Sequence, residues 1–129
     1  MSKDLLDLAV LERKKYNELN EVMDLTRQLG EALDRSDKVS IKMLVAMRQD
    51  PILRLEEIER TAKERRKSLP QEEAERVEAL LGGAAPRGQE EKTFQEQSRQ
   101  ARSLLERVVE LDRRINLRMA GEDSFYNKK

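Results

Sequence analysis

Residues 39–69 read VSIKMLVAMRQDPILRLEEIERTAKERRKSL, and this stretch decides how the chain folds. Its apolar residues recur at steps of three, four and seven. They are Leu44, Met47, Leu55, Ile58, Ala62 and Leu69. This spacing places them on one stripe of a long helix, which we expect to cover about residues 38–68. Asp50-Pro51 lies near its centre, where proline either kinks one helix or begins a new one capped by Asp50. Because the stripe resumes in phase after Pro51, the pattern favours the kink.

Helical periodicity also covers the sequence before this stretch. Residues 3–35 carry apolar side chains on one broad face. They are Leu5, Leu8, Leu11, Leu19, Val22, Leu25, Leu29 and Leu33. Gly30 lies inside this helix at a cost of about 1 kcal/mol relative to alanine, and a close approach of another helix would compensate for it. The turn that follows is short, with Ser36 or Asp37 as the cap of the next helix, so the first two helices should be antiparallel neighbours.

Two further helices are expected after the central stretch. Residues 70–81 begin with a proline followed by acids, and the glycine pair that follows them is a helix stop signal. Residues 82–89, GGAAPRGQ, then predict a flexible linker. A last long helix should span about residues 90–120 and end at Gly121, which leaves residues 121–129 as a tail.

These elements predict an all-α fold in one domain, residues 1–129. The expected architecture is an antiparallel bundle, or coiled coil, of three long helices with one additional short helix. We expect the helix over residues 38–68 to be its spine, with the first and last helices packed along it. Met43 and Met47 are interpreted as packing residues of that spine, because methionine at helical spacing usually fills a core.

The composition argues against several classes of function. Charged residues make up 40% of the 129 residues and aromatic residues only 3%. Lys plus Arg and Asp plus Glu both number 26, so the net charge is zero, and a dedicated nucleic-acid binder usually shows a basic excess. No apolar run approaches the roughly 20 residues of a membrane span, and the first residues carry no signal-peptide pattern. The sequence therefore predicts a soluble, cytoplasmic protein.

Residue types also argue against an enzyme. The chain has no histidine and no cysteine. Serine–histidine triads, cysteine–histidine pairs and the usual zinc ligand sets are therefore impossible. The segment GGAAPRG lacks the Gly-Lys-Ser/Thr ending of a phosphate loop. We expect no catalytic residues, no cofactor and no metal site.

The basic cluster at residues 63–67 has a simple structural interpretation. It lies in the last turns of its helix, where cations complement the helix dipole. RNA or acidic-partner binding is the alternative role for this cluster.

The last helix is the candidate partner-binding element. Its apolar residues cover more than one seam, so its second side must be covered by the short third helix or by another chain. Together with the adjacent aromatic pair of the tail, the candidate binding residues are Leu104, Leu105, Val108, Val109, Leu111, Ile115, Met119, Phe125 and Tyr126. The aromatic pair could fold back on the bundle or serve as an exposed docking point. Homo-oligomerisation is a second way to cover this surface.

Two segments of the chain resemble the FlgN-type flagellar type III export chaperones. The first helix carries Leu5, Leu8, Glu12, Tyr16 and Leu19 in the rhythm of that family. After a tight turn at Ser36-Asp37, the second helix is similar to the family's Leu-x-x-Leu-Glu-x-x-Arg pattern. Its residues are Leu55, Ile58, Glu59, Arg65, Arg66 and Leu69.

The resemblance implies a chaperone for hook–filament junction subunits. Such a chaperone binds the helical terminal segment of an unassembled subunit and keeps it ready for secretion. Laying an amphipathic client helix against an apolar face requires no catalytic group. The alternative function is a structural coiled-coil adaptor or self-assembling scaffold.

Overall fold

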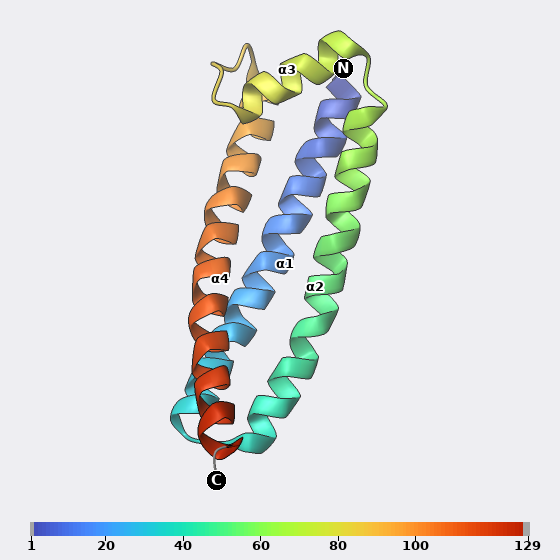
Figure 1. The fold of residues 1–129 in the computed structure, drawn as a ribbon. Helices are drawn as coiled ribbons and strands as arrows, with labels where there is room; N and C mark the ends of the chain where they lie inside the picture. Colours follow the sequence, from blue (N-terminus) through green and yellow to red (C-terminus); the bar gives the residue numbers. More distant parts are fainter. Residues whose placement is uncertain (1, 128–129) are drawn as a thin grey trace.

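The computed structural model describes the backbone of residues 2–127 and the side chains of residues 3–121. The elements are α1 (Ser2–Asp34), α2 (Lys38–Lys67), α3 (Gln71–Leu81) and α4 (Gln89–Asn127). The all-α class is therefore confirmed. Figure 1 shows three long helices side by side, with α3 lying across one end between α2 and α4. The expected helix end at Gly121 is wrong, since α4 continues through it to Asn127.

The central helix of the bundle is α1, and the expectation that the second helix is the spine is wrong. Helix α1 packs against both α2 and α4, whereas no Cα of α2 comes within 8 Å of a Cα of α4 among the described residues. The physical reason is the width of the apolar faces. Helix α1 buries hydrophobic residues along its whole length, whereas the only hydrophobic residues that α2 buries besides Pro51 are Leu44 and Ala62.

Three clusters form the core along the length of α1. At the end near α3, two turns of α1 meet α3 and the start of α4. The middle cluster joins α1 to α4, with partly buried residues of α2 against it. The cluster at the other end joins all three long helices. The end clusters include Phe94 and Leu29 respectively, and the middle one includes Leu19, all nearly inaccessible to solvent.

Helix α2 is continuous through Pro51, so the alternative of a break does not occur. Pro51 itself is buried. The expectation that Met43 and Met47 pack in the core is wrong, since they are 54% and 47% exposed. Arg48, which is one residue after Met47 and four after the buried Leu44, takes the core position instead and is 7% exposed.

Gly30 confirms the expected close approach of two helices. A Cβ added to Gly30 would lie 3.1 Å from Cδ1 of Ile115 on α4. The glycine therefore lets α4 pack closely on α1, and this contact offsets its low helix propensity.

The turn between α1 and α2 is closed by hydrogen bonds at both helix ends. The Asp37 N–H donates to the Ala32 carbonyl over 2.9 Å, which ends α1 with Ser36 in the left-handed region at φ 54°. Asp37 is the N-cap of α2, as its carboxylate accepts from the Ser40 N–H over 3.1 Å and from the Ser40 hydroxyl over 2.6 Å. These bonds hold the pKa of Asp37 below its usual value.

Replacing Ser36 with glycine should stabilise the protein, because glycine adopts positive φ without the Cβ clash that serine has. We expect a gain of about 0.5–1 kcal/mol in the free energy of unfolding, measured by urea denaturation. Gly83, which ends α3 at φ 101°, is the matched control. Gly83→Ala should cost about 1 kcal/mol, and a stabilising Gly83→Ala would contradict this account.

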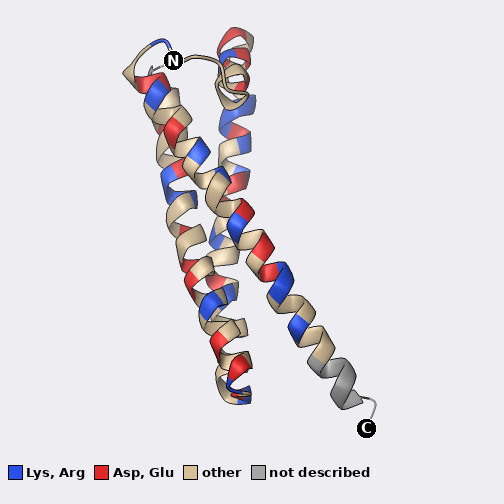
Figure 2. Ribbon diagram, turned by 90° about the vertical axis from the view of Figure 1, so that its left-hand side faces the viewer, with Lys and Arg blue, Asp and Glu red and all other residues tan. Residues whose placement is uncertain are grey.

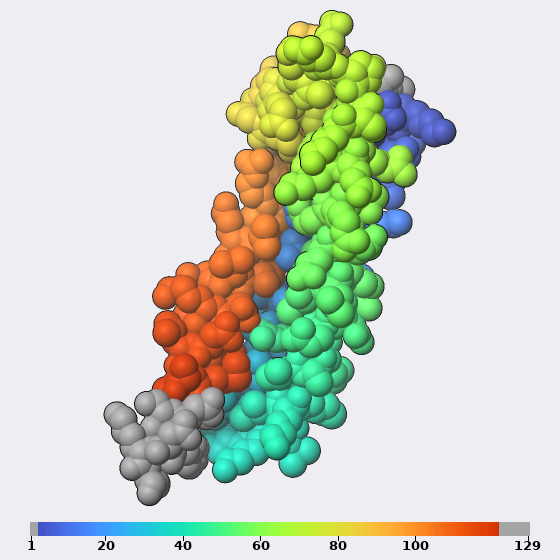
Figure 3. All heavy atoms as spheres, turned by 45° about the vertical axis from the view of Figure 1, so that its right-hand side comes forward, coloured from blue at the N-terminus to red at the C-terminus, as the bar shows by residue number. Residues whose placement is uncertain are grey.

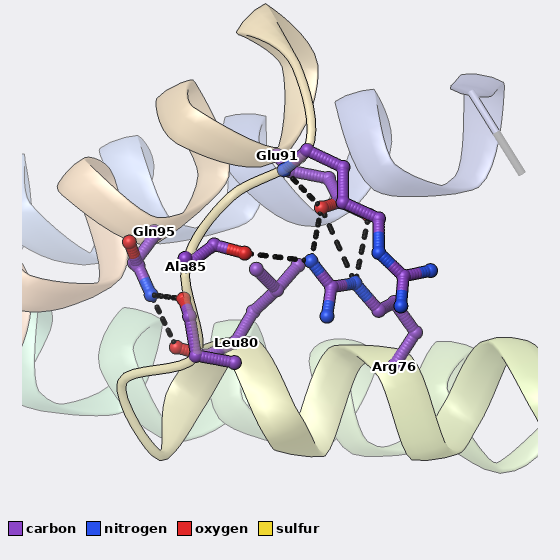
Figure 4. Close-up of polar contacts among 7 residues, drawn as sticks. Arg76, Leu80, Ala85, Glu91 and Gln95 are labelled. Carbon is purple, nitrogen blue, oxygen red and sulfur yellow. Dashed lines mark hydrogen bonds and ion pairs between the residues drawn. The ribbon is translucent and has the colours of Figure 1, made fainter.

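The connection between α3 and α4 is held by side chains and is not a loose linker (Figure 4). Arg76 on α3 donates to both carboxylate oxygens of Glu91 on α4, at 2.6–3.2 Å, and to the Ala85 carbonyl at 2.9 Å. The amide of Gln95 donates to the carbonyls of Leu80 and Ala84, at 2.9 and 2.8 Å. These bonds fix the angle between α3 and α4.

Glu91 makes this connection sensitive to acid. The Arg76 guanidinium, together with the Arg87 N–H, lowers the pKa of Glu91 from 4.5 to about 2. A depressed pKa stabilises the folded state fully above pH 4.5, and this contribution is lost as the pH falls towards 2. We expect Glu91→Gln to cost about 1–2 kcal/mol at pH 7. The difference in unfolding free energy between the two proteins should shrink between pH 4.5 and 2, as measured by urea denaturation, and a constant difference would contradict the assignment.

Candidate functional site: a groove between two helices

A groove runs between α2 and α4, with α1 as its floor. Its volume is about 520 Å³. Figure 3 shows it in the space-filling view, where atoms of α1 are visible at the bottom between α4 and α2. The groove exists because both flanking helices pack on α1 while their backbones stay apart, with no Cα of α2 within 8 Å of a Cα of α4 among the described residues. We call it the α2–α4 groove. Its lining residues are Lys15, Leu19, Ile52, Leu55, Glu56, Glu59, Arg60, Lys63 and Leu105.

The α2–α4 groove has an apolar interior and a charged rim. Leu19 of α1 is fully buried beneath it, Ile52 and Leu55 line the α2 side, and Leu105 lines the α4 side. The rim carries charges of both signs, mostly from α2, and Lys15 forms an ion pair with Glu59 across α1 and α2. Apolar walls with a polar border are typical of a surface that receives an amphipathic helix.

The sequence-predicted binding residues of α4 separate into two groups. Leu105 and Val109 are 39% and 56% exposed, and Leu105 lines the groove. The others that the structure describes pack inside the chain. Leu104, Val108 and Ile115 are buried, and Leu111 and Met119 are partly buried against the core clusters. The side chains of Phe125 and Tyr126 lie outside the described residues. Leu105 and Val109 are therefore the most exposed described members of the set, and Leu111 lines a second pocket between α1 and α4.

A polar bridge joins the three long helices one turn beyond the groove. The Arg48 guanidinium donates to the carboxylate of Asp112 on α4 over 2.5 Å and to the Thr26 hydroxyl on α1 over 3.2 Å. Thr26 in turn donates to the Val22 carbonyl over 2.6 Å. The bridge spans the space between α2 and α4, so it limits the groove at this end.

Sequence reasoning missed this bridge, although a signal was present. Arg48 lies four residues after Leu44 and four before Ile52, so it occupies the apolar stripe of α2. A charged residue at a stripe position indicates a buried ion pair, and its partner could not be identified without the packing of α4.

A buried carboxylate lies toward the other end of the groove. Glu12 on α1 is 9% exposed and lies seven residues, or two helical turns, before Leu19 on the same face. Burial raises the pKa of Glu12. No hydrogen bond or ion pair joins Glu12 to another side chain among the described residues.

Charged residues of both flanking helices interact electrostatically with Glu12. Glu59 and Arg66 come from α2, Arg102 comes from α4, and Lys15 comes from α1 itself. Glu12 lies three residues before Lys15 and seven before Leu19, so it shares the face of α1 on which these two groove residues lie.

The residues of the basic cluster at 63–67 have different roles: some lie at the end of α2, and others contact α1 or the groove. Arg65, Arg66 and Lys67 occupy the last turn of α2, as the dipole interpretation expects. Arg65 also pairs with Asp7 on α1 over 2.9 Å, and Lys63 lines the groove. Figure 2 shows acidic and basic residues mixed along the helices in that view, with α4 running obliquely across the other two.

Other kinds of site find no support in the described part of the chain. It contains no group of three or more acidic side chains placed to hold a metal ion. None of its helices is long and apolar enough to cross a membrane. In comparisons with known proteins, no family model, no curated protein and no solved structure matches this chain.

Proposed function

We propose that this protein is a cytoplasmic export chaperone that holds a helical segment of a client protein in the α2–α4 groove. One observation carries the proposal, namely an apolar groove between two helices that pack on a common third helix. A client helix laid in the groove would contact α1, α2 and α4 together and complete a four-helix bundle. It would bury Leu105, which is 39% exposed in the free chain.

The dimensions of the groove suit a short helix. Its α2 wall extends from Ile52 to Lys63, which at 1.5 Å per residue corresponds to about 16 Å, or three helical turns. Helices that pack directly have axes about 8–10 Å apart, and described parts of α2 and α4 have no Cα pair within 8 Å, so they do not pack backbone to backbone. Three turns present about four apolar side chains on one face.

The resemblance of residues 3–70 to FlgN-type chaperones supplies the identity of the client. On that basis we propose the terminal helical segment of a hook–filament junction subunit, held unassembled in the cytoplasm before secretion. This role requires binding and release only, which agrees with a chain that has no histidine and no cysteine.

Fluorescence anisotropy with a labelled peptide from the terminal helix of a hook–filament junction subunit tests the proposal. We expect saturable binding to the wild-type chain and at least a tenfold loss of affinity with Leu105→Asp, since a charge would replace an apolar wall. Leu53→Asp is the matched control, because Leu53 is exposed on α2 and does not line the groove. Equal binding by wild type and Leu105→Asp would overturn the groove as the site.

A second apolar surface favours the alternative of an adaptor or self-assembling scaffold. Val39, Met43 and Met47 recur every four residues on α2 and are all exposed, so they form one outward stripe. If this stripe drives assembly, light scattering should show an oligomer that Met43→Lys dissociates. A monomer over the micromolar range would eliminate self-assembly.

A further inference from the structure

We infer that the helix bound in the α2–α4 groove carries an uncharged hydrogen-bond donor, of the asparagine or glutamine type, at the position that lies over Glu12. This inference deepens the proposed function and rests on it. It adds a rule of client selection, because it requires one polar residue at a fixed place on an otherwise apolar helix face.

The first step is the state of Glu12 in the free protein. Its side chain is 9% exposed and forms no hydrogen bond or ion pair among the described residues. What stabilises its charge is therefore the remaining water and the more distant cations around it. A carboxylate in this position is costly to enclose further without a donor.

The second step is what docking does to this carboxylate. Glu12 shares its helix face with Leu19 and Lys15, both of which line the groove. A helix that extends along α1 toward α3 from the groove would cover Glu12 and remove its residual water. An apolar residue at that position would leave a buried carboxylate without a partner, whereas a donor would replace the lost water.

The third step is the charge of the donor. The charged groups that interact electrostatically with Glu12 are Lys15, Arg66, Arg102 and the second acid Glu59. With Glu12 included, three cations face two carboxylates, so the cluster already has an excess of positive charge. Lys15 is occupied by Glu59. A client lysine would add a further charge to this excess, whereas an amide donates a hydrogen bond without adding charge.

A scan of synthetic peptides tests the inference. The probes are 18-residue amphipathic helices with a leucine stripe, in which each stripe position in turn is Leu, Gln, Lys or Glu, and binding is measured by anisotropy. For the wild-type chain we expect one stripe position at which Gln binds about tenfold more tightly than Leu, with Lys weaker than Gln and Glu weakest.

Two variants of the protein complete the test. In Glu12→Leu the preference at that position should reverse, so that the all-leucine peptide binds best. Glu31→Gln removes an exposed carboxylate of α1 that does not line the groove and should leave the preference unchanged. Circular dichroism checks that both variants keep the helical content of wild type.

The outcomes separate the inference from the proposed function. If no peptide binds, or if Leu105→Asp binds them as wild type does, the groove itself is not a helix-binding site. If peptides bind in the groove but no position prefers Gln, or if Glu12→Leu keeps the preference, the role of Glu12 is overturned while the groove stands.

Discussion

Val108→Asp is expected to unfold the bundle. Val108 is 6% exposed in the middle core cluster, where α4 meets α1 beside Leu104. The substitution removes an apolar side chain and places a carboxylate where no cation is paired with it. We expect a loss of about 4 kcal/mol or more, a large share of the 5–15 kcal/mol that stabilises a typical domain. Thermal and urea denaturation followed by circular dichroism would measure it.

Leu105→Asp is the matched control on the next residue of the same helix. Leu105 is 39% exposed, so its aspartate remains in water and the protein should lose no more than about 1 kcal/mol. The pair separates packing from binding, because Val108→Asp should unfold the protein, whereas Leu105→Asp should weaken client binding with little loss of stability. Similar stability of the two variants would contradict the assignment of Val108 to the core and of Leu105 to the groove.

Asp112→Asn should destabilise the protein more than replacement of its ion-pair partner Arg48 with methionine. The substitution leaves the Arg48 guanidinium, 7% exposed, without its carboxylate. Because the Asp112 side chain is partly open to solvent, we expect a loss of about 2–3 kcal/mol, below the cost of breaking a fully enclosed pair. Urea denaturation would measure this loss as a lower free energy of unfolding. The slope of that free energy against urea concentration should be the same as in wild type.

Arg48→Met provides the comparison. Methionine fills a similar volume, Thr26 keeps its hydrogen bond to Val22, and Asp112 remains accessible to water. We therefore expect a change of less than about 1 kcal/mol, and in the double variant most of the loss caused by Asp112→Asn should be recovered. A large destabilisation by Arg48→Met alone would show that the ion pair itself supplies net stability.

The helices could be predicted because their signals are local. Apolar spacing located all four helices, and the caps and stop signals set most of their ends to within one or two residues. Gly121 was the exception, since a single glycine in open space costs a helix only about 1 kcal/mol. The stop at Gly82-Gly83 was predicted correctly because Gly83 adopts a positive φ that suits a helix end.

The candidate site could be predicted only in part. Leu105 was in the predicted set because it widens the apolar face of α4. Apolar spacing placed Leu104 and Val108 in the same set, although both are buried in the core. Arg48 and Glu12 were not predicted as parts of the site, because their importance depends on groups that lie on other helices.

By itself, the sequence determined the helical class, the helix positions and the absence of histidine and cysteine chemistry. Each of these follows from residue type or from spacing within one helix. The tertiary structure alone decided that α1 and not α2 is central, and that α2 and α4 stand apart over it. The physical reason is that an apolar stripe specifies which side of a helix is buried but not which neighbour covers it, and the groove is a property of that choice.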